Sequence, residues 1–237
     1  MLRSLRLGEA DRVLHLYTLD GGRAGAVAKG IRKTRSRFGA RLEPLSHVQV
    51  GLHHGRGELS TVTGVDLIAS HRETREDPYR LAVALAGAEA VLRLFDEQDA
   101  NERAFHALVR FLELTDALAA PGRASAPTLD PLALSFQLKL LWLAGYLPHL
   151  ESCAECGAEG PPAGYSPRAG GAVCRSCAEG AIPLSHQALR GIEGLLRRPL
   201  ADARAVRLTT RSAREALRVI VASHEYHGGF RLRTLTA

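Results

Sequence analysis

The sequence has no run of about 18 apolar residues, the length that a membrane-spanning helix needs. Its start, Met1-Leu-Arg-Ser-Leu-Arg, lacks the apolar core of a secretory signal peptide. Cysteine is scarce too, because the four cysteines among 237 residues are too few for a disulfide scaffold. These absences predict a cytosolic protein, whose thiols stay reduced and available to a metal.

Motifs of catalysis are missing as well. We find no nucleophile elbow, no paired Asp-x-Asp and no zinc-hydrolase helix. Residues 25–30 resemble a phosphate loop but lack its Gly-Lys-Ser/Thr ending, which excludes ATP binding of that type. The sequence therefore predicts a protein that is not an enzyme.

What is present is a globular composition, 46% hydrophobic and 24% charged, long enough for one large domain or two small ones. The net charge of +6 is unevenly distributed. Residues 1–80 contain 14 basic and 9 acidic residues, residues 81–150 contain 5 basic and 8 acidic, and residues 151–237 contain 12 basic and 8 acidic. Both ends of the chain are basic and its middle is acidic.

Between residues 12 and 66, apolar residues recur at every second position, which is typical of half-buried strands. The runs cover residues 13–19, 24–28, 45–52 and 59–65, and Asp20-Gly21-Gly22 is a hairpin signal between the first two. Four or five short strands with glycine-rich turns fit a small closed barrel. The oligonucleotide-binding (OB) fold is one common form, and other small β folds fit equally well.

From residue 77 onward the apolar period becomes helical. Each of five segments follows a residue typical of a helix start: Asp77-Pro78, Asn101, Asp130-Pro131, Ser185, and Thr209 or Thr210. The segment from 131 to 145 is apolar nearly all round, which predicts the buried centre of a bundle. The prediction is an α+β, multi-domain chain: a β-barrel over 1–76 and an α-helical domain over 77–237 with an insertion at 151–180.

The insertion carries two Cys-x-x-Cys pairs separated by 17 residues: Cys153 and Cys156, then Cys174 and Cys177. Each pair can turn both sulfurs toward one point, and two pairs complete the tetrahedral shell that zinc favours. Four sulfurs leave no open position for water, so we expect one structural Zn²⁺. A redox pair normally needs one Cys-x-x-Cys, and this spacing does not suggest an iron–sulfur cluster. His224 and His227 form a weaker metal candidate, with no third ligand nearby in sequence.

Residues 21–41 carry seven cations and no acidic residue: Arg23, Lys29, Arg32, Lys33, Arg35, Arg37 and Arg41. Gly30, Ser36 and Gly39 interrupt them, which indicates a flexible basic loop. Phosphate backbones supply the complementary charge, so the pattern favours nucleic-acid binding over a solvated loop without a partner. Phe38 within the segment could stack on a base, although an apolar anchor for the loop is the favoured interpretation.

Several segments resemble the amino-terminal domain of the bacterial RecO family of DNA repair proteins: Leu7-Gly8-Glu9-Ala10-Asp11-Arg12, Ala28-Lys29-Gly30-Ile31-Arg32-Lys33, Ser36-Arg37-Phe38 and Leu42-Glu43-Pro44-Leu45. Others resemble its central helix and zinc knuckle: Phe136 with Leu140 and Leu141, Gly145-Tyr146-Leu147-Pro148, and residues 153–157. Order and spacing agree over nearly the whole chain.

The resemblance implies an OB barrel followed by a helical domain with a zinc finger, in a recombination mediator of the RecF pathway without catalytic turnover. Such proteins bind single- and double-stranded DNA and anneal complementary strands. They contact the C-terminal tail of single-strand binding protein (SSB) through the helical domain, and with RecR they help to load RecA on SSB-coated DNA. The resemblance places DNA contacts at Lys29, Arg32, Lys33, Arg35 and Arg37. It also implies a bacterial protein in the cytoplasm, associated with the nucleoid.

Members of that family usually begin several residues earlier, with a strand leading into residues 2–5. We therefore expect either a start upstream of Met1 or a short first strand, which would leave an open barrel edge. Two other functions compete with the mediator: a zinc-stabilised adaptor whose basic ends bind acidic proteins instead of DNA, and a zinc enzyme acting on nucleic acid. Four-sulfur ligation argues against the enzyme.

Overall fold

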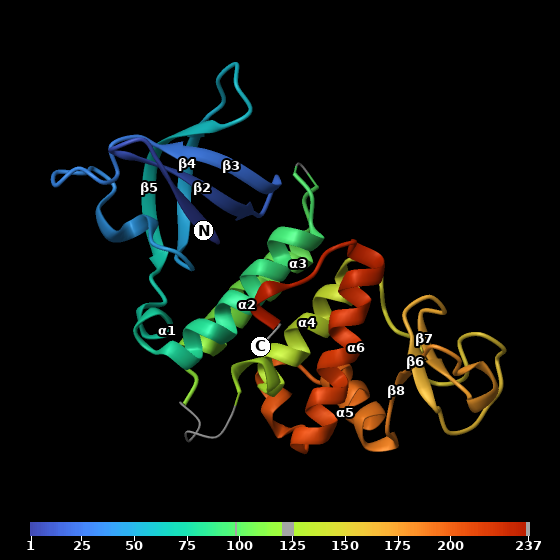
Figure 1. Ribbon diagram of the computed structural model, residues 1–237. Helices are drawn as coiled ribbons and strands as arrows, with labels where there is room; N and C mark the ends of the chain where they lie inside the picture. Colours follow the sequence, from blue (N-terminus) through green and yellow to red (C-terminus); the bar gives the residue numbers. More distant parts are fainter. Residues whose placement is uncertain (98, 120–125, 236–237) are drawn as a thin grey trace. The chain divides into compact units, whose positions relative to one another are not determined.

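A computed structural model describes residues 1–97, 99–119 and 126–235 (Figure 1). The chain forms two compact units, Met1–Ala84 with Phe95–Ala117, and Leu85–Leu94 with Leu118–Ala237. Among the described residues, no helix combines the length and the apolar character needed to cross a membrane. Most of the expected loop between the second and third predicted helices, residues 120–125, lies outside the described residues.

The N-terminal unit contains a five-stranded sheet: β1 (Arg3–Leu7), β2 (Asp11–Thr18), β3 (Gly22–Ala28), β4 (His47–His53) and β5 (Ser60–Ala69). The four strands predicted from alternation are confirmed as β2 to β5. β2 and β3 pair antiparallel across the predicted hairpin, where Gly22 has a φ of +62°. Inward-facing residues of these strands build one apolar core that also includes Phe38 and Leu42 from the loop after β3.

The strand order is β1-β2-β3-β5-β4, with β3 and β5 parallel over two residue pairs and all other neighbours antiparallel. The predicted closed barrel is not confirmed, because no ladder joins β1 to β4 in the described part of the chain. Two hydrogen bonds connect the residues that precede these strands: the Met1 amine donates to the Ser46 carbonyl at 2.9 Å, and Leu45 N donates to the Met1 carbonyl at 2.8 Å. This contact is too short to count as strand pairing.

Two helices complete this unit, α1 (Arg72–Glu76) and α3 (Glu102–Asp116), together with the first turns of α2 (Pro78–Leu94). Asp116 ties α3 to α1, since its carboxylate accepts from the backbone N and the hydroxyl of Thr74 at 2.7 and 2.9 Å. Arg80 donates to the Asp116 carbonyl at 2.8 Å. The boundary expected at residue 76 follows the change of period along the chain, whereas the structure groups α3 with the sheet.

The C-terminal unit is a helical bundle of α4 (Pro131–Leu143), α5 (His186–Arg197), α6 (Thr210–Gly228) and the end of α2. The predicted caps are confirmed, because Asn101, Asp130, Ser185 and Thr209 each accept a hydrogen bond from a backbone N–H in the first turn. α4 is buried along nearly its whole length, as its apolar sequence predicted, and packs against α5 and α6. The described residues also form short 3₁₀ helices: η1 (Gly39–Leu42) in the N-terminal unit, and η2 (Pro127–Leu129), η3 (Arg175–Cys177), η4 (Leu200–Ala205) and η5 (Arg233–Leu235) in the C-terminal unit.

The insertion between α4 and α5 forms a three-stranded antiparallel sheet in the order β7-β6-β8, from β6 (Gly164–Ser166), β7 (Gly171–Val173) and β8 (Ile182–Pro183). Tyr165 of β6 is 1% exposed and its hydroxyl lies 2.8 Å from the Ser223 hydroxyl of α6. The buried side chain of Tyr165 therefore links the insertion to α6 of the bundle.

Candidate metal centre and basic loop

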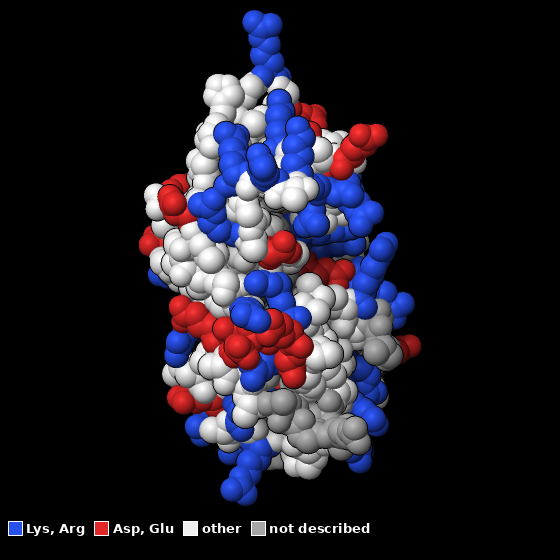
Figure 2. Space-filling model, turned by 90° about the vertical axis from the view of Figure 1, so that its left-hand side faces the viewer, with Lys and Arg blue, Asp and Glu red and all other residues white. Residues whose placement is uncertain are grey.

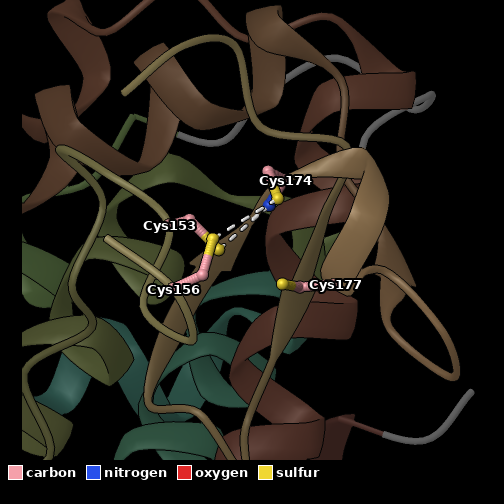
Figure 3. Close-up of side chains that lie close together, drawn as sticks. All are labelled: Cys153, Cys156, Cys174 and Cys177. Carbon is pink, nitrogen blue, oxygen red and sulfur yellow. Dashed lines mark hydrogen bonds between the residues drawn. The ribbon is translucent and has the colours of Figure 1, made fainter. Parts of the chain in front are cut away.

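The four cysteines converge in the insertion, with their sulfurs facing a common point (Figure 3). All four sulfurs lie within 4.8 Å of one another, and Cys156 Sγ is 3.8 Å from Cys174 Sγ. A tetrahedral site with Zn–S bonds of about 2.3 Å places its sulfurs about 3.8 Å apart. No pair is close to the roughly 2.05 Å of a disulfide, so the cysteines are free thiols arranged as metal ligands. The cluster can hold one metal ion.

Local backbone bonds shape each pair of cysteines. In the first, Gly157 N donates to the Cys153 carbonyl at 2.8 Å, and Gly157 has a φ of +74°, which glycine adopts without strain. In the second, Cys177 N donates to the Cys174 carbonyl at 3.1 Å. These tight turns bring both sulfurs of a pair to the same side, as the spacing predicted.

The electrostatics of the cluster favour a cation. The backbone N–H of Cys174, 3.3 Å from Cys153 Sγ, lowers the pKa of the Cys153 thiol to about 6, so a thiolate is present at neutral pH. Side-chain hydrogen bonds with the thiols of Cys156 and Cys174 raise the pKa of Cys177 to about 12, because they favour its protonated form. A divalent ion would replace these protons and let all four ligands ionise.

His224 and His227, the weaker metal candidate, each contact another side chain. His224 is fully buried, and its Nε2 lies 3.0 Å from the Gln137 side-chain oxygen. His227 stacks on Tyr146, with ring centroids 4.5 Å apart. Neither histidine belongs to a metal-ligand cluster among the described residues, so the weaker metal candidate finds no support.

The basic segment joins β3 to β4, and the Asp11 carboxylate together with backbone carbonyls of the turn before β2 anchors its first turn. Gly30 N donates to the Asp11 carboxylate at 2.7 Å, and Arg32 N donates to the Ala10 carbonyl at 2.9 Å. The Arg32 guanidinium also donates to the Glu9 carbonyl at 2.9 Å. Local sequence reasoning missed Asp11, because the segment itself has no acid and the contact crosses 19 residues.

The seven predicted cations divide by environment. Five are exposed, and four of these lie on the turn that follows β3: Lys29, Arg32, Lys33 and Arg35. Within the described part of the chain, the side chains of Lys29, Lys33 and Arg35 have no hydrogen-bond or ion-pair partner. Figure 2 shows Lys and Arg side chains gathered where the loop side of this unit faces the viewer. These four residues form the loop cluster.

The other three cations have side-chain partners within the N-terminal unit. Arg41 donates to the Val65 and Phe38 carbonyls at 3.0 and 3.1 Å, and Arg37 donates to the Val62 carbonyl at 3.3 Å while its guanidinium covers the Phe38 ring at 4.8 Å. Arg23 lies within β3, half-buried, 3.7 Å from the Glu97 carboxylate.

Phe38 is 1% exposed in the core of the N-terminal unit. It is therefore the apolar anchor of the loop, and the alternative of a base-stacking platform is wrong because no base can reach the ring.

Comparison with known proteins shows the family of this chain. Residues 1–71 match the family described as Recombination protein O N terminal, and residues 75–236 match Recombination protein O C terminal. A DNA repair protein RecO of Rubrobacter xylanophilus is 42% identical over 230 residues, covering 94% of this chain and 88% of that relative. The chain therefore belongs to the RecO family and has a role in DNA repair and recombination.

Proposed function

We propose that this protein is a non-enzymatic recombination mediator that binds single- and double-stranded DNA through the phosphate backbone. The supporting observation is the loop cluster, which consists of four exposed cations. Three of their side chains have no hydrogen-bond or ion-pair partner among the described residues. Arginine and lysine neutralise phosphates without reading bases, so the binding has little sequence preference. Neutralisation also lets complementary strands approach each other, which is a route to annealing without ATP.

The N-terminal unit would then act as an OB-type DNA-binding domain. Its strand order suits such a fold, with the basic loop leaving one end of the sheet. Since Phe38 is buried, affinity would come from charge and not from base stacking on this ring.

The metal of the insertion would be one structural Zn²⁺, because four thiolates in a tetrahedral arrangement are the ligand set that zinc prefers. Cys153, Cys156, Cys174 and Cys177 would hold it with no position left for a reacting water. The ion would stabilise the insertion and take no part in a reaction.

The partners would be those of the family: RecR, the acidic C-terminal tail of SSB, and RecA indirectly. A cytoplasmic location at the nucleoid would follow from these partners. A protein that holds DNA and also contacts SSB can expose strands for RecA without catalysis of its own.

The test is fluorescence anisotropy of a labelled single-stranded oligonucleotide, titrated at several salt concentrations. If about four phosphates are neutralised, the logarithm of the association constant falls against the logarithm of salt concentration with a slope of roughly −3. The double variant Lys33→Glu, Arg35→Glu should lose most of this binding, because both side chains project from the loop without a fold contact.

The matched control is Arg103→Glu, Arg218→Glu, which changes the net charge equally at two exposed helix positions outside the loop. It should bind nearly as the unmodified protein does. Absence of oligonucleotide binding at low salt would overturn the mediator proposal and favour the adaptor that binds acidic proteins.

A further inference from the structure

A second concentration of arginine lies in the C-terminal unit, along a groove between α5 and the segment that follows η4. The groove has a volume of about 460 Å³, and three of its lining side chains are arginines: Arg190, Arg198 and Arg207. His186 lines it too, and no carboxylate does. We call these three residues the groove arginines.

The groove arginines differ from the other arginines nearby. Three neighbours each have a carboxylate at 3.9, 2.6 and 3.0 Å: Arg197 with Glu151, Arg204 with Asp130, and Arg211 with Glu215. None of the groove arginines has an ion-pair or hydrogen-bond partner for its side chain within the residues that the structure describes. The groove thus brings together three cations that no carboxylate of the described residues neutralises.

Helical spacing and glycine produce the shape. Arg190 and Gly194 lie one turn apart on α5, and Arg198 is the C-cap residue directly after the helix, so the two arginines mark the middle and the end of α5. Gly191 and Gly194 let the segment after η4 approach α5 closely. A Cβ added at Gly191 would lie 2.4 Å from the Leu208 side chain, and one added at Gly194 would lie 3.3 Å from the Val206 side chain. The arginine side chains therefore line the groove beside two glycines, Gly191 and Gly194.

This arrangement fits a polyanion with repeated charges. Guanidinium groups bind phosphates bidentately and remain charged at every physiological pH. A protein partner would in addition need a pocket for an aromatic or aliphatic anchor, yet the apolar side chains in the lining are only those of Ala205 and Val206. A nucleic-acid backbone needs no such pocket.

We propose that the groove arginines bind the phosphate backbone of a nucleic-acid strand, as a site separate from the loop cluster. This inference rests on the proposed DNA-binding function and adds a second contact surface, carried by the helical unit. A protein with two such surfaces can hold two strands at once, which is the arrangement that annealing requires.

The test compares Arg190→Gln, Arg198→Gln, Arg207→Gln with the control Arg103→Gln, Arg214→Gln, Arg218→Gln, each built into the full chain carrying Lys33→Glu, Arg35→Glu. The control removes three exposed cations away from both sites. Each phosphate contact on a single strand contributes about 0.7 to the salt slope, so the groove variant should flatten the slope for a labelled oligonucleotide by about 2. The control should leave the slope unchanged.

Circular dichroism and thermal melting verify that the variants fold, and the single variant Arg190→Gln should flatten the slope by about 0.7. In the unmodified loop background, the groove variant should also slow the annealing of two complementary labelled oligonucleotides at least tenfold, while the control anneals normally.

Four results would overturn the inference. An equal loss in groove and control variants would mean a general effect of net charge. Normal slope and annealing in the groove variant, with the loop variant defective, would remove the groove site and leave the proposed function intact. Groove-dependent binding of a poly-glutamate peptide without groove-dependent DNA binding would assign the surface to an acidic protein. Absence of DNA binding by the unmodified protein would overturn both proposals.

Discussion

Among single residues, His224 is a buried histidine whose Nε2 has a hydrogen-bond partner and whose Nδ1 has none in the described part of the chain. Gln137 Nε2 donates to the Ala86 carbonyl at 2.9 Å, so its side-chain oxygen faces His224 Nε2 and accepts a hydrogen bond from it. This contact assigns the tautomer, with the proton on Nε2. Burial lowers the pKa of His224 from 6.5 to about 4, because the charged imidazolium would lose its hydration.

The pH dependence of stability follows from this shift. The folded pKa is below the unfolded one, so His224 contributes stability that is complete above pH 6.5 and is lost as the pH falls toward 4. The loss amounts to about 3 kcal/mol. Urea unfolding from pH 7 to pH 4 should show it, and His224→Gln should reduce the dependence. His15, His47 and His227 also have lowered pKa values and remain in both proteins, so the difference isolates His224. Equal pH dependence in both proteins would contradict the assignment.

A second residue-scale prediction concerns Asp130, which is 1% exposed, caps α4 and lies 2.6 Å from Arg204. Arg204→Met should lower the free energy of unfolding by about 2 kcal/mol, because it leaves a buried carboxylate without its cation. Arg214→Met, at an exposed position of α6, is the control and should change stability by less than about 0.5 kcal/mol. Equal effects in urea unfolding would show that the ion pair contributes little.

The insertion is the element whose stability depends most on its ligands. Cys174→Ser should abolish stoichiometric metal and lower the melting temperature by about 5 °C or more, since an incomplete shell loses much of its metal affinity. Ser176→Ala, between the same two cysteines, should retain metal and melt normally. Metal content by atomic emission, with thermal melting, checks both. Full metal content in Cys174→Ser would contradict the four-cysteine site.

Close packing of backbone also supports the insertion. A Cβ at Gly171 would lie 2.1 Å from the His149 carbonyl oxygen, where two backbone segments meet. Gly171→Ala should therefore destabilise the insertion and weaken metal retention, by more than about 1 kcal/mol in unfolding free energy. Gly57→Ala, with open space around the added carbon, is the matched control. Metal loss on titration with a chelator provides the readout.

For the whole molecule, the loop cluster and the metal ligands belong to different compact units. Removing the metal by chelation should lower the melting temperature of the helical unit and leave the oligonucleotide affinity of the loop cluster within about twofold. Anisotropy before and after chelation measures this. A parallel loss of affinity would show that the metal-bound insertion supports DNA binding.

The amino-acid sequence by itself determined the features that depend on neighbours along the chain. The alternation within residues 13–19, 24–28, 45–52 and 59–65 predicted β2 to β5 because strand faces repeat every two residues. Caps such as Asn101 and Asp130 predicted the helix starts, and the two Cys-x-x-Cys pairs predicted the metal cluster, because each depends on spacings of a few residues. The exposed loop cations were predictable for the same reason.

Only the tertiary structure decided what depends on distant residues. It showed an open sheet, with β3 parallel to β5 across 34 residues, and it placed α3 with the sheet. It showed that Arg37 and Arg41 hydrogen-bond to the Val62 and Val65 carbonyls of β5. The groove arginines likewise meet across two segments, α5 and residues 205–207, whose sequences show no common pattern. A local pattern cannot encode such pairings, since they form when the chain closes and buries its apolar surface.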